Sequence, residues 1–321
     1  MDFAARVDWE KESRPMASGP IRILVVAAHP ADAFDQAGGT LAHHVAEGDQ
    51  VSALIVTGGA RSHDWQMVDR HLKADEPVDL EKDSDEGHEK KTDETRRACA
   101  ELGITDLHFF GLEDDEEMLT QEIVFRIAEK FRELRPHIVI THHPYEEGGF
   151  KMHASVGRGV LYARRACTGS SRLSGKPWLV PVVYFMNPMA YVNHNSLNQG
   201  VGFFRSDVYV DITDVVEKKV RAMDCIESQY YAGLYARKAT EIGDGAHGNM
   251  VMTSYAEQFQ RYTAQICYKL PMSDFEVRTA DEPREQTMIR RGYMLDHMAS
   301  MPEGQRPNGL PYEFDRDLYD P

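Results

Sequence analysis

The sequence predicts an α/β protein with a Rossmann-like, doubly wound and mostly parallel sheet. Short apolar runs rich in β-branched residues alternate along the chain with segments of helical periodicity, which is the pattern of βαβ units. The first runs are apolar throughout, as expected for strands that are buried on both faces of a parallel sheet. With 321 residues, 42% of them hydrophobic, the chain can bury such a core without disulfides.

The first βαβ unit is the most clearly marked. IRILVVAA (21–28) is the first predicted strand, and AGGTLAHHVAEG (37–48) is the following helix, with Gly48 just past its end. VSALIV (51–56) is the second strand. A crossover of this length makes the two strands parallel, with right-handed connection as the default.

The later elements continue the alternation. Residues 65–91 are dense in Asp, Glu and Lys, so we expect a solvated loop or lid there. The elements expected after it are, in order, a helix over 93–102, a strand over 107–111, a helix over 122–134, a strand over 137–141, a helix over 153–167, the strand LVPVVYFM (179–186), a strand over 208–212 and a helix from Thr213.

Three segments are expected along the chain. Residues 1–19 are polar and form an irregular arm, and residues 20–269 form the catalytic α/β domain, including a C-terminal helical extension. Residues 270–321 hold several prolines and little periodicity, which is typical of an irregular tail that wraps the domain.

Composition and charge narrow the function classes. A net charge of −16 disfavours nucleic acid and anionic membrane as partners, so we expect a small-molecule substrate. No apolar run approaches the roughly 20 residues that span a bilayer. The N-terminus lacks the apolar region of a secretory signal, and the cysteines have no CxxC pair, which together favour the reducing cytoplasm.

Polar residues follow two of the predicted strands, at the edge where ligands bind in open α/β sheets. His29 and Asp32 come after the first strand, and THHPYEEGGFKMH supplies His142, His143 and His153 after the fourth. Two imidazoles and one carboxylate would leave coordination positions open for water and substrate, as in a catalytic metal site. Zn²⁺ is the first expectation, and Fe²⁺ or Mn²⁺ accept the same ligands. The alternative is a His-Pro turn in which Asp32 caps the next helix.

The stretch ILVVAAHPADAFDQAGGTLAHH resembles the opening of the PIG-L (LmbE-like) superfamily, whose signature is a buried strand, AHPDDE and a GG-T-LA helix. Further similarities are TGGARSHD after the second strand, GGFKMHASVG after the fourth, and SYAEQF near the end of the domain. They occur in the family's order over roughly residues 20–262. The resemblance implies one divalent metal, with its ligands at His29, Asp32 and His153.

The chain also departs from the family's deacetylases. Their general base is the first Asp of HPDD, and that position is Ala31 here. Their loop before the last ligand reads H-P-D-H, whereas this chain has Phe150, Lys151, Met152 and then His153. The 4-oxalomesaconate hydratase branch carries Ala at the first of these positions, in an AH-x-AD-F type of motif. Its Glu-bearing turn after the second strand is GGARSHD in this chain.

Similarity to that branch implies addition of water to a small unsaturated oxo-carboxylate, or the reverse elimination. The alternatives are zinc-dependent N-deacetylation of an amino sugar or related amide through another base, and a pseudoenzyme that serves as a binding module. The family resemblance and the long tail favour a homo-oligomer.

Other candidates would surround the metal. Arg61 is expected to clamp a substrate carboxylate and His63 to shuttle a proton, unless both lie in a solvated loop. His142 and His143 alternate at a strand end, so only one is expected to face the metal, and we favour His143 because it lies nearer the loop.

Two further residues are weaker candidates. Glu147, or Glu146 beside it, could replace the missing base, although loop carboxylates of an acidic chain are usually solvated. His247 lies in the Gly-rich segment GDGAHGNM, which is flexible enough to reach the substrate site of its own or a neighbouring subunit.

Overall fold

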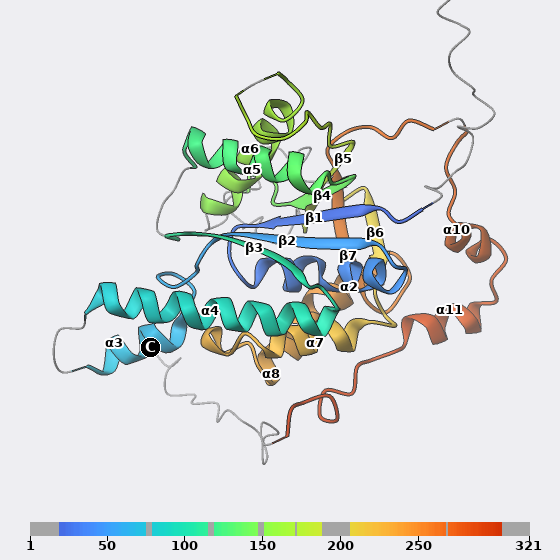
Figure 1. The fold of residues 1–321 in the computed structure, drawn as a ribbon. Helices are drawn as coiled ribbons and strands as arrows, with labels where there is room; N and C mark the ends of the chain where they lie inside the picture. Colours follow the sequence, from blue (N-terminus) through green and yellow to red (C-terminus); the bar gives the residue numbers. More distant parts are fainter. Residues whose placement is uncertain are drawn as a thin grey trace, which may run out of the picture.

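Seven strands form a single sheet at the centre of the protein (Figure 1), in the order β3-β2-β1-β4-β5-β7-β6. The computed structural model describes residues 19–74, 79–114, 119–146, 151–170, 172–187, 206–267 and 269–303. All neighbouring pairs from β3 to β5 are parallel, and β7 runs antiparallel to both β5 and β6. The predicted mostly parallel sheet is thus confirmed; its strands are β1 (Arg22–Ala27), β2 (Gln50–Thr57), β3 (Asp106–Leu112), β4 (Ile138–Thr141), β5 (Val182–Met186), β6 (Val208–Asp211) and β7 (Ala256–Arg261).

Helices cover both faces of the sheet, as Figure 1 shows. Alternate residues of β1 face opposite layers: Ile23 and Val25 join the core beneath α2 and α7, and Leu24 and Val26 the core beneath α5 and α6. No described helix is long and apolar enough to cross a bilayer. The main helices are α2 (Asp32–Ala46), α3 (Trp65–Lys73), α4 (Leu80–Leu102), α5 (Gln121–Leu134), α6 (Lys151–Ala166), α7 (Val216–Asp224), α8 (Leu234–Thr240) and α9 (Ala246–Met250).

The position of β1 decides where a ligand can bind. Its neighbours are β2 on one side and β4 on the other, so the chain reverses its direction of travel across the sheet beside β1. In doubly wound sheets, this reversal opens a crevice at the carboxyl ends of the strands. α2 follows β1 and α6 follows β4, and both helices therefore begin at that crevice.

The expectation of a solvated loop over residues 65–91 is wrong. Apart from 75–78, which lie outside the described residues, this segment forms α3 and the first half of the 23-residue helix α4. Its charged residues hid the buried side chain of Lys91, because the partner of Lys91 lies far away in the sequence. Lys91 Nζ donates to Gln229 Oε1 at 2.9 Å, and Glu94 accepts from the Ser228 backbone and hydroxyl.

The described part of the tail, 269–303, is less irregular than expected. It contains two short helices, α10 (Asp274–Thr279) and α11 (Arg284–Arg291), and runs along the outside of the domain in Figure 1. The Leu295 N–H donates to Tyr255 Oη at 2.9 Å, and the Arg237 guanidinium donates to the Ser300 carbonyl. These bonds attach the tail to the C-terminal extension of the domain.

A buried ionic group holds α2 in place. Glu257, in the SYAEQF segment, accepts hydrogen bonds from the backbone N–H groups of Gly39 and Thr40, both at 2.8 Å. The Lys219 Nζ atom, on α7, lies 2.9 Å from Glu257 Oε1 and 2.7 Å from Asp244 Oδ2. Lys219 is 1% exposed, so its charge is compensated by these two carboxylates and by little solvent.

Removing the Lys219 charge should destabilise the fold strongly. Lys219→Met would leave two buried carboxylates without their cation, and we expect the free energy of unfolding to fall by about 3–5 kcal/mol. Urea denaturation followed by circular dichroism measures this. The exposed neighbour Lys218 is the matched control, and an equal loss in Lys218→Met would contradict the buried-charge explanation.

Candidate active site

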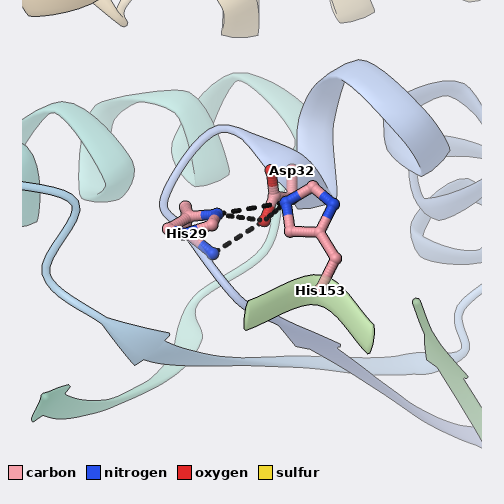
Figure 2. A group of neighbouring side chains, drawn as sticks. All are labelled: His29, Asp32 and His153. Atoms are coloured by element: carbon pink, nitrogen blue, oxygen red, sulfur yellow. Dashed lines mark hydrogen bonds and ion pairs between the residues drawn. The ribbon is translucent and has the colours of Figure 1, made fainter. Parts of the chain in front are cut away.

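Three side chains meet at the carboxyl edge of the sheet (Figure 2). His29 follows β1, Asp32 is the first residue of α2, and His153 lies in the first turn of α6. The His29 Nδ1 and His153 Nε2 atoms are 3.1 Å apart, and Asp32 Oδ2 is 3.3 Å from each. Their exposed fractions are 2%, 6% and 1%. The structure therefore brings together the three residues for which the sequence predicts metal ligation.

Asp32 does not cap α2. The residue before the helix is Ala31, and no side chain there accepts a bond from the first turn. Asp32 Oδ2 instead accepts from the His29 backbone N–H at 2.7 Å, which folds the short loop back on itself. The carboxylate is thereby turned toward the two histidines, away from the helix backbone.

Two hydrogen bonds indicate which nitrogen of each histidine carries the proton. The Ala28 N–H, which can only donate, lies 2.9 Å from His142 Nε2, so that nitrogen is an acceptor. His153 Nδ1 lies 2.5 Å from Glu146 Oε1, a carboxylate oxygen that can only accept when ionised. The neutral His153 ring therefore keeps its proton on Nδ1 and presents a lone pair from Nε2.

Several lone pairs thus face one small buried space. They come from His153 Nε2, Asp32 Oδ2 and His29, whose pKa burial lowers to about 4 and whose ring is therefore neutral. His142 Nε2 lies 3.2 Å from Asp32 Oδ2, but its lone pair already accepts from the Ala28 N–H. Although burial opposes it, the carboxylates of Asp32 and Glu146 raise the pKa of His153 to about 10, a sign that the group attracts positive charge. A divalent cation fits this donor set.

Ring orientation separates this group from two others of similar composition. A metal ion binds an imidazole nitrogen in the plane of the ring, so two stacked rings cannot both point at one ion. The His29 and His63 rings lie 3.9 Å apart with a tilt of 31°, and those of His142 and His153 lie 3.9 Å apart at 21°. The His29 and His153 rings lie further apart, with centres 5.0 Å apart and a tilt of 48°. Among the described groups, this wider angle favours His29, Asp32 and His153 as the candidate metal set.

The sequence favoured His143 over His142 as the residue that faces the metal, and the structure shows the opposite arrangement. It is His142, and not His143, whose ring contacts the candidate ligands. His143 packs edge-on against Phe185, with ring centres 5.0 Å apart, and its Nδ1 accepts from the Tyr145 N–H. We expected the residue nearer the loop to face the metal, but the strand register turns the earlier one toward Asp32. A catalytic role for His143 stays a prediction.

His63 belongs to a hydrogen-bonded relay. The Ser62 hydroxyl donates to Asp114 Oδ2, so its oxygen can accept from His63 Nδ1 at 2.6 Å. Asp114 also accepts from the backbone N–H groups of Arg61 and Ser62, at 2.9 and 2.8 Å. These bonds, acting against burial, hold the pKa of Asp114 far below its ordinary value. Asp114 was not predicted from the sequence, although its position just after β3 is a feature by which it could have been identified.

Comparisons with known proteins identify a family to which part of the chain is similar. The family model PIG-L, described as GlcNAc-PI de-N-acetylase, matches residues 24–164. Residues 24–164 therefore match the PIG-L family over slightly less than half of the chain. All three candidate ligands, His63, Asp114 and Glu146 lie within the matched residues.

Relatives of the chain include enzymes of two kinds. The 4-oxalmesaconate hydratase of Pseudomonas putida is 25% identical over 274 residues, which is 81% of this chain and 96% of the relative. A 1D-myo-inositol 2-acetamido-2-deoxy-alpha-D-glucopyranoside deacetylase of Thermomonospora curvata is 29% identical over 181 residues, covering 51% of this chain and 59% of the relative. The chain thus matches little more than half the length of that deacetylase.

A solved structure shares the fold. The crystal structure of the 4-carboxy-2-hydroxymuconate hydratase from Pseudomonas putida superposes with a TM-score of 0.62 at 23% identity. The match covers 78% of this chain and all of that one. At this level of identity, the likeness establishes the α/β fold.

The remaining predicted site residues lie in different parts of the chain. The Arg61 guanidinium lies 2.5 Å from Glu113 Oε2, so part of its charge is already compensated. His247, on α9, lies outside the matched PIG-L residues; burial, followed by the nearby Lys219 charge, lowers its pKa. Glu147 lies outside the described residues, as does Phe150 of the altered loop. Their proposed roles stay predictions.

Glu146 should control metal affinity through His153. Because Glu146 fixes the proton on His153 Nδ1, Glu146→Gln should weaken zinc binding about 10–100-fold, as partners of metal-bound histidines usually do. Competition with a fluorescent chelator measures this. Glu133→Gln, on the exposed face of α5, serves as the control. Unchanged zinc affinity in the Glu146 variant would show that the 2.5 Å contact does not orient the ligand.

Proposed function

We propose that this protein is a metal-dependent hydratase that adds water to a small unsaturated oxo-carboxylate, or catalyses the reverse elimination. The observation that carries the proposal is the Asp114–Ser62–His63 relay, whose His63 ring lies 3.9 Å from the ring of His29. It supplies an oriented histidine where the deacetylase carboxylate is replaced by Ala31. Similarity to the Pseudomonas putida hydratase over 96% of that enzyme supports the same conclusion.

Three residues would hold the metal. His29, Asp32 and His153 offer two nitrogens and one carboxylate oxygen, the open ligand set of catalytic zinc sites. A bound Zn²⁺, or Fe²⁺ or Mn²⁺ in its place, would polarise an oxo-acid and stabilise enolate charge. Glu146 would keep the His153 lone pair directed at the ion, since it holds the opposite nitrogen.

His63 is suited to move the proton that hydration requires. Hydration places a hydroxyl group on one carbon of a double bond and a proton on the other. With its Nδ1 proton directed at Ser62, His63 would accept a proton from water at Nε2 and return one to carbon. Asp114 stabilises the charged ring that exists between these two events, from 3.4 Å. Arg61 and His247 are proposed to contact an anionic substrate.

Deacetylation stays the second candidate, because the Thermomonospora curvata relative and the family description both name it. With Ala31 at the position of the usual base, it would also depend on His63 or on Glu147. The two reactions differ in product, since deacetylation releases acetate and hydration does not.

Metal content is the first measurement. Inductively coupled plasma mass spectrometry of the purified protein should find about one zinc, iron or manganese ion per chain, as a catalytic site with three protein ligands requires. His29→Ala and His153→Ala should each lose it. A wild-type protein without metal after reconstitution would overturn the proposal and favour a binding module.

Activity measurements then test the role of His63. His63→Ala should lower kcat for hydration of 4-oxalomesaconate about 10²–10⁴-fold with unchanged metal content, since it removes the general base. Asp114→Asn should cost about 10–100-fold, because it acts only through His63. The loss of ultraviolet absorbance on hydration reports the rate.

His43→Ala is the control, since His43 lies on α2 and pairs with Asp214 at the surface. Release of acetate from an N-acetylglucosaminyl inositol, with no hydration of the oxo-acid, would instead establish the deacetylase.

A further inference from the structure

Gln36 is a buried polar side chain with no hydrogen-bonding partner. It is 3% exposed, and both Nε2 and Oε1 are shielded from solvent without a bond to any described group. Folding removes this amide from water without providing hydrogen bonds in place of those to water, which lowers the stability of the protein. Native proteins contain few such groups, and those they keep often have a function.

Gln36 lies on the helix that begins at the candidate metal centre. Gln36 lies four residues after Asp32 on α2, and residues at this spacing share one face of a helix. Side chains on a helix lean toward its N-terminus. The long Gln36 side chain therefore extends back toward the turn that holds Asp32.

Other unsatisfied atoms lie along the same stretch of helix. The Thr40 hydroxyl, one turn further on the same face, is buried and also has no partner. Asp35 Oδ1, beside Gln36, is a third such case. Unsatisfied polar atoms are thus concentrated in the helix that begins at the metal loop, which indicates a place for a polar ligand.

Packing of α2 does not explain the amide. The helix is held by Glu257 at the Gly39 and Thr40 N–H groups, and by Phe34 and Leu41 in the core. A leucine or methionine of similar volume would fill the Gln36 space without leaving a donor and an acceptor unsatisfied.

We propose that Gln36 binds a carboxylate or oxo oxygen of the substrate beside the metal, and so selects oxygen-rich small acids. This inference rests on the proposed function and deepens it. The amide Nε2 offers two N–H donors, and the Thr40 hydroxyl offers another, so both suit an oxygen acceptor. A site built to hydrogen-bond a polar group also rejects analogues that lack it, because its own groups are then left unpaired.

The test combines binding and stability in the zinc-loaded, full-length protein. Titration calorimetry with oxaloacetate, a small oxo-dicarboxylate, should show a Kd about 10–100-fold higher in Gln36→Leu than in the wild type, the loss expected for one buried hydrogen bond. The Tm of the variant should not fall, because a buried unsatisfied amide has been removed. Gln36→Met, which keeps the side-chain length, repeats the measurement if the leucine variant folds poorly.

Gln260→Leu is the matched control. Gln260, on β7, also has a buried Oε1 without a partner, and its replacement should leave oxaloacetate binding unchanged. Equal Kd values in the wild type and both Gln36 variants, or no binding to the wild type, would overturn the inference.

Measurement of hydration kinetics distinguishes a failure of the Gln36 role from a failure of the proposed hydratase function. Hydration of 4-oxalomesaconate with an unchanged KM in Gln36→Leu would contradict the role of Gln36 alone. Absence of hydration, together with weakened oxaloacetate binding in the variant, would contradict the hydratase and leave the subsite supported.

Discussion

Crowding of lone pairs at the carboxyl edge of the sheet is the constraint on which the rest of the site depends. His29 Nδ1, Asp32 Oδ2 and His153 Nε2 lie within 3.3 Å of one another in a buried space. Such an arrangement is repulsive unless a proton on His153 or a bound cation compensates it. The surrounding groups maintain it: the Ala28 N–H holds His142, and Glu146 holds the far side of His153. A backbone donor on His142 and a carboxylate acceptor on His153 thus fix the orientation of these two rings.

The relative orientation of the histidine rings distinguishes the candidate metal ligands from the candidate proton-transfer group. The His29 and His153 rings, 5.0 Å apart at 48°, are the candidate pair for one ion, whereas the His63 ring lies 3.9 Å from that of His29 at 31°. The same contact keeps His63 beside the metal position, where a proton-transfer group is useful. Ser62 and Asp114 fix its orientation from the loops after β2 and β3. One edge of the sheet therefore supplies both the candidate metal ligands and the proposed acid–base group.

This division explains how one domain can have both hydratases and deacetylases among its relatives. A metal held at the ends of β1 and β4 can activate several kinds of oxygen compound, and the reaction depends on the groups placed around it. In this chain, Ala31 removes one carboxylate and the Asp114 relay provides a histidine. The buried Lys219–Glu257 contact meanwhile fixes α2, the helix from which Asp32 and Gln36 project.

The sequence by itself determined the α/β class, the mostly parallel sheet and the residues of the candidate metal centre. It could do so because buried strands are apolar runs, because His29 and Asp32 closely follow one strand, and because the resemblance to the PIG-L superfamily implies His153 as the third ligand. Only the tertiary structure decided the rest. Helix α3 and the start of α4 were hidden in a charged segment, since Lys91 and Glu94 find their partners more than 130 residues away. The choice of His142 over His143, the Asp114 relay and the isolation of the Gln36 amide likewise depend on contacts between distant segments, which no local pattern of residues records.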